Sequence, residues 1–152
     1  MLVFKKIFPL LLFTMIINSF FVAQGKQTNW TEGFGISIAT DRAIYSIEEP
    51  VTITFTIFNY TKDTLTFSFT TSQRYDFVIE KEEKVIWRWS SGRMFAQVMG
   101  KEVVKPGGSL VYKEVYRPQK KLTPGIYTVT GMLTCREPLK IKGTVCIQIG
   151  NR

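Results

Sequence analysis

Apolar side chains recur at every second position along most of the chain after residue 33. In the segment 50–60, PVTITFTIFNY, valine, isoleucine and phenylalanine alternate with threonine. A period of two places one set of side chains on the buried face of a β-strand and the other set on its exposed face. Most of these positions hold β-branched or aromatic residues, which are enriched in strands. The pattern therefore predicts half-buried strands.

The same alternation is found in other segments, namely 34–40, 64–71, 74–80, 85–89, 109–116, 125–135 and 140–150. Turn-forming stretches rich in glycine, proline or charged residues lie between them, such as KPGGS at 105–109 and LTPG at 122–125. No segment has the pattern of an amphipathic helix, and GRMFAQVMGK at 92–101 could at most form a short turn. About eight short strands joined in this way predict an all-β fold, an antiparallel β-sandwich of the immunoglobulin-like type.

Residues 1–25 form a different kind of segment. Lys5 and Lys6 precede an apolar run at 7–23 that contains no charged residue. Small residues then lead to Gly25, and this order is typical of a secretory signal peptide. We therefore expect cleavage after Gly25 and export of the remainder, either as a secreted protein or to the cell envelope.

An uncleaved membrane anchor is the alternative interpretation of the 7–23 run. A helix needs about 20 apolar residues to cross a bilayer, and this run is slightly shorter and contains Pro9 and Asn18. If it were retained, this run would be the part of the protein that attaches to a membrane. Residues 26–33 are expected to be a flexible lead-in, and 34–150 a single sandwich domain.

Basic residues outnumber acidic residues, and the net charge of the chain is +8. Removal of Lys5 and Lys6 with the signal segment would lower this charge by two, to +6. The basic residues are scattered, whereas a nucleic-acid-binding surface requires them to cluster on one face. The charge instead favours an anionic envelope surface or an acidic protein partner. It leaves the oligomeric state open.

The sequence lacks the residues that common enzymes and metal sites require. It contains no histidine, the usual general base near neutral pH. It also contains no G-x-S-x-G or S-x-x-K motif and no phosphate-binding glycine loop. Its carboxylates fall mainly in predicted turns, at 48–49 and 80–83, which indicates solvated charge rather than a calcium site. We predict a protein without catalytic residues, metal ligands or cofactor.

Cys135 and Cys146 are the two cysteines of the chain. Oxidising compartments preserve disulfides, so the expected export leads us to predict a Cys135–Cys146 bridge. The bridge would close a short loop and stabilise the fold by about 3 kcal/mol. Two buried thiols are the alternative. The spacing of the two residues lacks the paired ligands of a zinc site.

Aromatic and cationic residues are concentrated in the segments 72–79 and 87–95. If these segments pair as a hairpin in simple register, their shared core face carries Tyr75, Phe77, Ile79, Val85, Trp87 and Trp89. Arg74, Asp76 and Arg88 then point to the other face. There, Asp76 and Arg88 would form an ordinary surface ion pair that contributes little to stability. Both tryptophans are interpreted as core residues.

The segment from Ser90 to Arg93 departs from the strand pattern. It contains Gly92 and a basic side chain that we expect to be exposed. Loops held on a rigid scaffold often carry the binding function of a protein. This tip is therefore the strongest candidate for contact with a partner.

Four stretches, in this order, resemble the BsuPI-type intracellular proteinase inhibitor domain: RYDFVI (74–79), VIWRWSSGRMFAQ (85–97), KPGGSLVYKEVY (105–116) and PGIYTVTGML (124–133). The resemblance covers about residues 36–135, and the pairing of RYDF with WRWS is its most specific part. It implies an immunoglobulin-like β-sandwich and, for the founding member, inhibition of an intracellular serine proteinase of subtilisin type. The export signal departs from this picture, because an exported protein should not meet an intracellular proteinase.

We therefore predict a secreted or envelope-associated inhibitor with an exposed loop that lies in the cleft of a subtilisin-like serine proteinase as an extra strand. The expected contact residues are Arg74, Tyr75, Ser90, Ser91, Gly92, Arg93, Met94 and Phe95. The alternative is a non-inhibitory module of the cell envelope that binds another protein or an anionic wall polymer through its positive charge.

Overall fold

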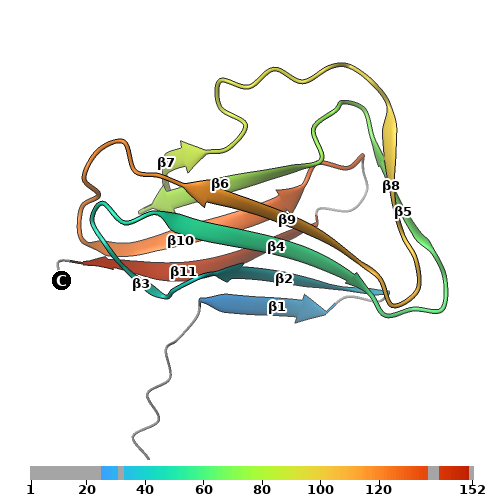
Figure 1. Cartoon of the computed structure of the whole chain (residues 1–152), viewed down its shortest axis with the longest axis horizontal. Coiled ribbons are helices and arrows are strands. Elements are labelled where there is room, and N and C mark those ends of the chain that lie inside the picture. Colours follow the sequence, from blue (N-terminus) through green and yellow to red (C-terminus); the bar gives the residue numbers. More distant parts are fainter. Residues whose placement is uncertain (1–24, 31–32, 137–140, 151–152) are drawn as a thin grey trace, which may run out of the picture.

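A computed structural model describes residues 25–30, 33–136 and 141–150, so the predicted signal segment lies outside the described residues except for Gly25. The described residues form eleven strands and no helix (Figure 1). This part of the chain accordingly holds no helix that could span a membrane. The strands are β1 (Lys26–Trp30), β2 (Phe34–Thr40), β3 (Ile44–Ser46), β4 (Val51–Asn59), β5 (Leu65–Phe69), β6 (Tyr75–Lys81), β7 (Lys84–Arg88), β8 (Gly100–Val104), β9 (Ser109–Tyr116), β10 (Gly125–Leu133) and β11 (Lys142–Gly150).

The strands form two main sheets that pack face to face, and a two-stranded ribbon at one end (Figure 1). One sheet has the order β1-β2-β4-β9, and the other has the order β3-β11-β10-β6-β7. Neighbours are antiparallel apart from β3 and β11, which run parallel. In the ribbon, β5, which follows β4, pairs with β8, which precedes β9. This arrangement confirms the predicted immunoglobulin-like β-sandwich.

The core lies between the two sheets and follows the predicted period of two. In β4, Val51, Ile53, Phe55 and Ile57 are buried, while the threonines between them are partly exposed. The opposite sheet approaches closely at Gly131, because a Cβ atom there would lie 3.0 Å from the ring of Phe55. A larger residue at that position would have to displace a core aromatic ring, so glycine sets the spacing of the sheets at this point.

Three strands, β1, β3 and β8, lie outside the segments in which alternation predicts strands. The flexible lead-in predicted over 26–33 is wrong in its first part, since Lys26–Trp30 forms β1 and pairs with β2 along its whole length. Main-chain hydrogen bonds hold this edge strand. Such bonds do not require alternating apolar side chains, so the sequence pattern did not indicate a strand here. The short turn considered over 92–101 is limited to its first residue, because Gly92 ends a turn, 93–99 has no regular structure and β8 begins at Gly100.

The predicted Cys135–Cys146 disulfide is wrong as well. Cys146 lies in β11 opposite Thr128, whereas Cys135 follows the far end of β10. In an extended chain, the separation between positions 128 and 135 corresponds to about 20 Å, but a disulfide needs Cα atoms closer than about 7 Å. The register of β10 and β11 therefore keeps the two cysteines apart.

Candidate functional site

The β6–β7 hairpin contains a bulge that sequence periodicity did not indicate. Ile79 pairs with Trp87, but the next residue of β6 pairs with Val85, so Ile86 is an extra residue in β7. An extra residue reverses the alternation of side chains beyond the bulge. For this reason Val85 is 46 % exposed, and its predicted place on the core face is wrong.

The other side chains predicted for the core face of this hairpin do lie there. Phe77 and Ile79 are fully buried. Tyr75, Trp87 and Trp89 are partly buried and pack against the core cluster. The two tryptophans are thus core residues, as predicted.

Asp76 anchors the end of β7 from the neighbouring strand. Its Oδ1 accepts hydrogen bonds from the main-chain N–H of Phe77 (2.9 Å) and of Ser90 (3.0 Å). Its Oδ2 accepts from Nη1 of Arg88 (3.0 Å) and from the hydroxyl of Ser90 (2.7 Å). The predicted pairing with Arg88 is present, but its predicted surface character is wrong, because Asp76 is only 4 % exposed. The carboxylate fixes the direction in which the chain leaves β7.

Trp89 is the centre of an aromatic and cationic cluster at the start of the following loop. Its ring centroid lies 4.5 Å from that of Tyr75 and 5.8 Å from that of Phe95. The guanidinium carbon of Arg93 lies 4.3 Å from the same indole centroid, within cation–π range. Arg93 Nε also donates a hydrogen bond of 2.9 Å to the main-chain oxygen of Trp89. The indole of Trp89 therefore contacts both residues that flank Met94 in the chain.

Tyr75 links this cluster to the opposite sheet. Its hydroxyl donates a hydrogen bond of 2.6 Å to Oε1 of Glu114 in β9, and its ring stacks on Tyr112 with centroids 4.5 Å apart. Burial and the Glu114 hydrogen bond raise the pKa of Tyr75 above its ordinary value. Burial also raises the pKa of Tyr112 to about 12. Tyr75 is therefore a partly buried support for Trp89, and its predicted role as a contact residue stays a prediction.

Ser90–Met99, called the 90–99 loop from here on, connects β7 to β8. A tight turn opens it, with hydrogen bonds from Ser91 N to Arg88 O and from Arg93 N to Ser90 O, each of 3.1 Å. Ala96 and Ser72 then bond twice, through Ser72 N to Ala96 O (2.8 Å) and Ala96 N to Ser72 Oγ (2.9 Å). The loop is thus fixed at its start and near its middle. In Figure 1 it arches away from the sandwich between β7 and β8.

Six of the predicted contact residues, Ser90 to Phe95, lie together in the 90–99 loop, whereas Arg74 serves another contact. Arg74 lies over the ring of Phe69 at 4.7 Å. It also donates from Nε to Glu102 (3.2 Å) and from Nη1 to the main-chain oxygen of Thr71 (2.6 Å). These bonds tie the start of β6 to β8, and none of them reaches the 90–99 loop.

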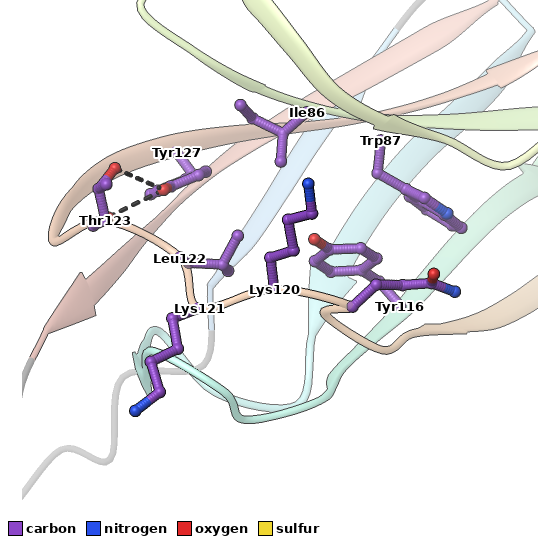
Figure 2. Close-up of a pocket in the computed structure, with 9 residues that line it drawn as sticks. Ile86, Trp87, Tyr116, Lys120, Lys121, Leu122, Thr123 and Tyr127 are labelled. Atoms are coloured by element: carbon purple, nitrogen blue, oxygen red, sulfur yellow. Dashed lines mark hydrogen bonds between the residues drawn. The ribbon is translucent and has the colours of Figure 1, made fainter.

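Two hollows flank Ile86 and Trp87. A hollow of about 420 Å³ on the loop side is lined by Val85, Ile86, Trp87, Arg88, Trp89, Ser91 and Arg93. A hollow of about 350 Å³ on the other side is lined by Ile86, Trp87, Tyr116, Gln119, Lys120, Lys121, Leu122, Thr123 and Tyr127. Figure 2 shows Lys120 reaching toward Ile86 and Trp87, while Lys121 extends away. Neither hollow was predicted from the sequence, and Ile86, the extra residue of the bulge, lines both.

The hairpin and the 90–99 loop lie within the part of the chain that matches a known protein family. The family model described as BsuPI, intracellular proteinase inhibitor, matches residues 38–138. The chain belongs to the BsuPI family. The match confirms the resemblance predicted from the sequence, and it spans every strand from the second half of β2 to the end of β10. Among curated proteins, none matches the chain.

Several solved structures are similar to this one at low sequence identity. The C-terminal domain of wzt is 10 % identical at a TM-score of 0.50, with 85 % of this chain and 79 % of that chain covered. Spo0M, a sporulation control protein from Bacillus subtilis, is 12 % identical at a TM-score of 0.48, with 84 % and 50 % covered. The alkylpurine DNA glycosylase AlkC from Pseudomonas fluorescens is 11 % identical at a TM-score of 0.42, with 72 % of this chain covered. This chain spans only 28 % of that glycosylase.

Replacement of Asp76 by alanine should destabilise the protein strongly. It would leave the N–H and the hydroxyl of Ser90 without their acceptor, while Arg88, whose side chain is 39 % exposed, could turn to water. Leaving partly buried donors of this kind unsatisfied costs about 2 kcal/mol. Urea unfolding would measure this loss. Asp63→Ala, in an exposed turn, is the matched control and should change the free energy of unfolding by less than about 0.5 kcal/mol. Equal effects of the two substitutions would contradict the assigned role of Asp76.

Stability should fall as the solution becomes alkaline. Burial raises the pKa of Tyr45 and Tyr112 to about 12 and raises those of Tyr75 and Tyr116 in the same direction. The tyrosines of the unfolded chain lose their protons near pH 10, while these four keep theirs in the folded state. The unfolded state then binds fewer protons, so the free energy of unfolding decreases as pH rises above about 10.

Urea unfolding between about pH 8 and pH 12 would measure this decrease. Tyr75→Phe removes one of the four groups and should make the alkaline slope shallower. A free energy of unfolding that stays constant from about pH 9 to pH 11.5 would show that these phenols ionise equally in both states.

Proposed function

We propose that the protein inhibits a subtilisin-like serine proteinase outside the cytoplasm, and that the 90–99 loop enters the substrate cleft of that enzyme. Membership of an inhibitor family makes binding to a proteinase the expected activity. The observation that supports this loop as the contact is its combination of fixed flanks and exposed tip. Arg93 and Phe95 both contact Trp89, while Met94 between them is exposed to solvent.

A loop held in this way binds at a lower entropic cost than a flexible loop. Ordering a mobile segment opposes association, whereas a segment already fixed before binding avoids most of that cost. The hydrogen bonds of Ser90 to Asp76 and of Ala96 to Ser72 fix the 90–99 loop in the unbound protein. This preorganisation distinguishes it from an ordinary connection between strands.

The main chain of the loop is also suited to strand addition. Among the described residues, the main-chain N–H and C=O of Met94 form no hydrogen bond. No residue of 93–99 has a positive φ angle or lies in a helix, so the segment after the turn can pair with a strand of a partner if it is extended there. An enzyme that binds its substrates as extended strands can bind such a segment in the same manner.

Export of this inhibitor is part of the proposal. The support comes from the sequence pattern of residues 1–25, a basic start, an apolar run and a small-residue exit. Export should remove this segment, so the protein recovered from the medium or envelope should begin at Lys26. N-terminal sequencing measures this start. A chain that begins at Met1 and stays in the cytosol would contradict export, and it would redirect the search for the target to intracellular proteinases.

The purified full-length protein should inhibit a subtilisin-like proteinase in a competitive assay with a peptide substrate. Arg93→Ala removes the cation–π contact and the hydrogen bond to Trp89, and both should stabilise the binding conformation of the loop. We expect the inhibition constant of this variant to rise about tenfold, which corresponds to 1.4 kcal/mol. Arg117→Ala, at an exposed arginine after β9, is the matched control and should inhibit like the wild type.

Two results would contradict the proposed function. One is the absence of inhibition of any subtilisin-like proteinase at micromolar protein. The other is binding to cell-wall material that disappears at moderate salt, with no inhibition. The second result would favour the alternative of an envelope interaction module.

A further inference from the structure

Met94 is the most exposed large apolar side chain among the described residues, at 97 %. When a partner covers an apolar side chain in this position, the side chain gains the free energy of leaving water, and this gain must exceed the rotamer entropy that it loses. Single exposed apolar residues are ordinary on protein surfaces. Met94 differs from them because its two neighbours in the chain are both fixed.

The contacts of these neighbours determine where Met94 points. Arg93 lies over the indole of Trp89 and bonds to its main-chain oxygen, while the ring of Phe95 packs near the same indole. Both flanking side chains are thus turned toward the sandwich. The side chain between them projects into solvent.

The indole itself is fixed by the strands beneath it. Trp89 N donates a hydrogen bond of 2.9 Å to the main-chain oxygen of Phe77 in β6. Tyr75 packs against the ring of Trp89, and Asp76 holds the next residue, Ser90. The position of Met94 is therefore set by the sandwich through a chain of short contacts, and not by contacts of its own.

We infer that Met94 enters the primary specificity pocket of the target, and that the target is a serine proteinase with an apolar pocket. This inference rests on the proposed function and names the residue and the partner class for the same loop. A long, unbranched and polarisable side chain can fill a deep apolar pocket. A pocket with a carboxylate at its base selects a cationic side chain instead, and a thioether there would leave that buried charge unpaired.

The inference distinguishes Met94 from the other exposed methionine of the loop. Met99 is 76 % exposed, but it directly precedes β8 and lies beyond the Ala96–Ser72 tether. It has no pair of fixed neighbours, so nothing presents it in a single orientation. The two residues are the same in type and similar in exposure, and they make a matched pair for substitution.

The decisive experiment compares the full-length wild type with Met94→Lys and Met99→Lys. Inhibition constants are measured against a subtilisin-like proteinase that the wild type inhibits, and against trypsin, which has a carboxylate in its pocket. Met94→Lys should weaken inhibition of the first enzyme at least tenfold and strengthen inhibition of trypsin at least tenfold. Met99→Lys should change neither value more than about twofold. Circular dichroism of each variant should match the wild type, since both side chains are exposed.

Slow proteolysis provides a second measurement. During long incubation with the inhibited enzyme, the first bond hydrolysed in the wild type should be the peptide bond between Met94 and Phe95, which mass spectrometry identifies from the fragment masses. A first cut at another bond of the 90–99 loop would overturn the assignment of Met94.

The outcomes separate this inference from the function on which it rests. If the wild type inhibits the subtilisin-like enzyme but Met94→Lys does so equally well, the inference is wrong and the proposed function stands. If the wild type inhibits no proteinase, both are wrong. A tenfold loss with Met94→Lys and none with Met99→Lys supports both.

Discussion

The buried carboxylate of Asp76 is the interaction on which the loop side of this molecule depends. It lies on β6 but accepts hydrogen bonds from Arg88 and twice from Ser90, at the end of β7. A buried charge is costly unless it is paired, so these bonds tie the position of Ser90 to that of Asp76. Trp89 packs against Tyr75, and the indole in turn holds the start of the 90–99 loop. Sheet, turn and loop are thereby connected without a helix or a disulfide in the described residues.

A second constraint is the bulge at Ile86. The extra residue moves Val85 off the core face, but it keeps Trp87 and Trp89 on that face. The bulge thus lies between the hairpin turn and the end of β7. After it, every second side chain of β7 still faces the core. Bulges are often found where a strand must re-aim its side chains near a functional site. Here the same bulge exposes Ile86 between two hollows, so it shapes the surface beside the loop as well as the path of the chain.

The sequence predicts the sandwich and the core face of β6 well, because a period of two is a local property and Phe77 and Ile79 follow it. It also indicates the position of the loop, since Ser90 and Gly92 end the alternation after Trp89. The features that it does not predict depend on pairing between distant segments. The burial of Asp76 requires a turn that covers it, and the edge strand β1 is held by main-chain bonds to β2 rather than by apolar side chains. The separation of the cysteines follows from the β10–β11 register, which their spacing in the sequence does not indicate.

The division between scaffold and tip bears on the proposed contact with a proteinase. Residues such as Asp76 and Trp89 are coupled to several neighbours, so their replacement alters stability and loop shape together. Met94 makes no contact that the fold requires, and a change of side chain there should alter the surface offered to a partner while the main chain keeps its course. A fold alone does not specify a target, and loops on a rigid sandwich can vary where the sandwich cannot. If the proposed role of Met94 holds, a change of this one side chain would fit the same sandwich to a proteinase with a different pocket.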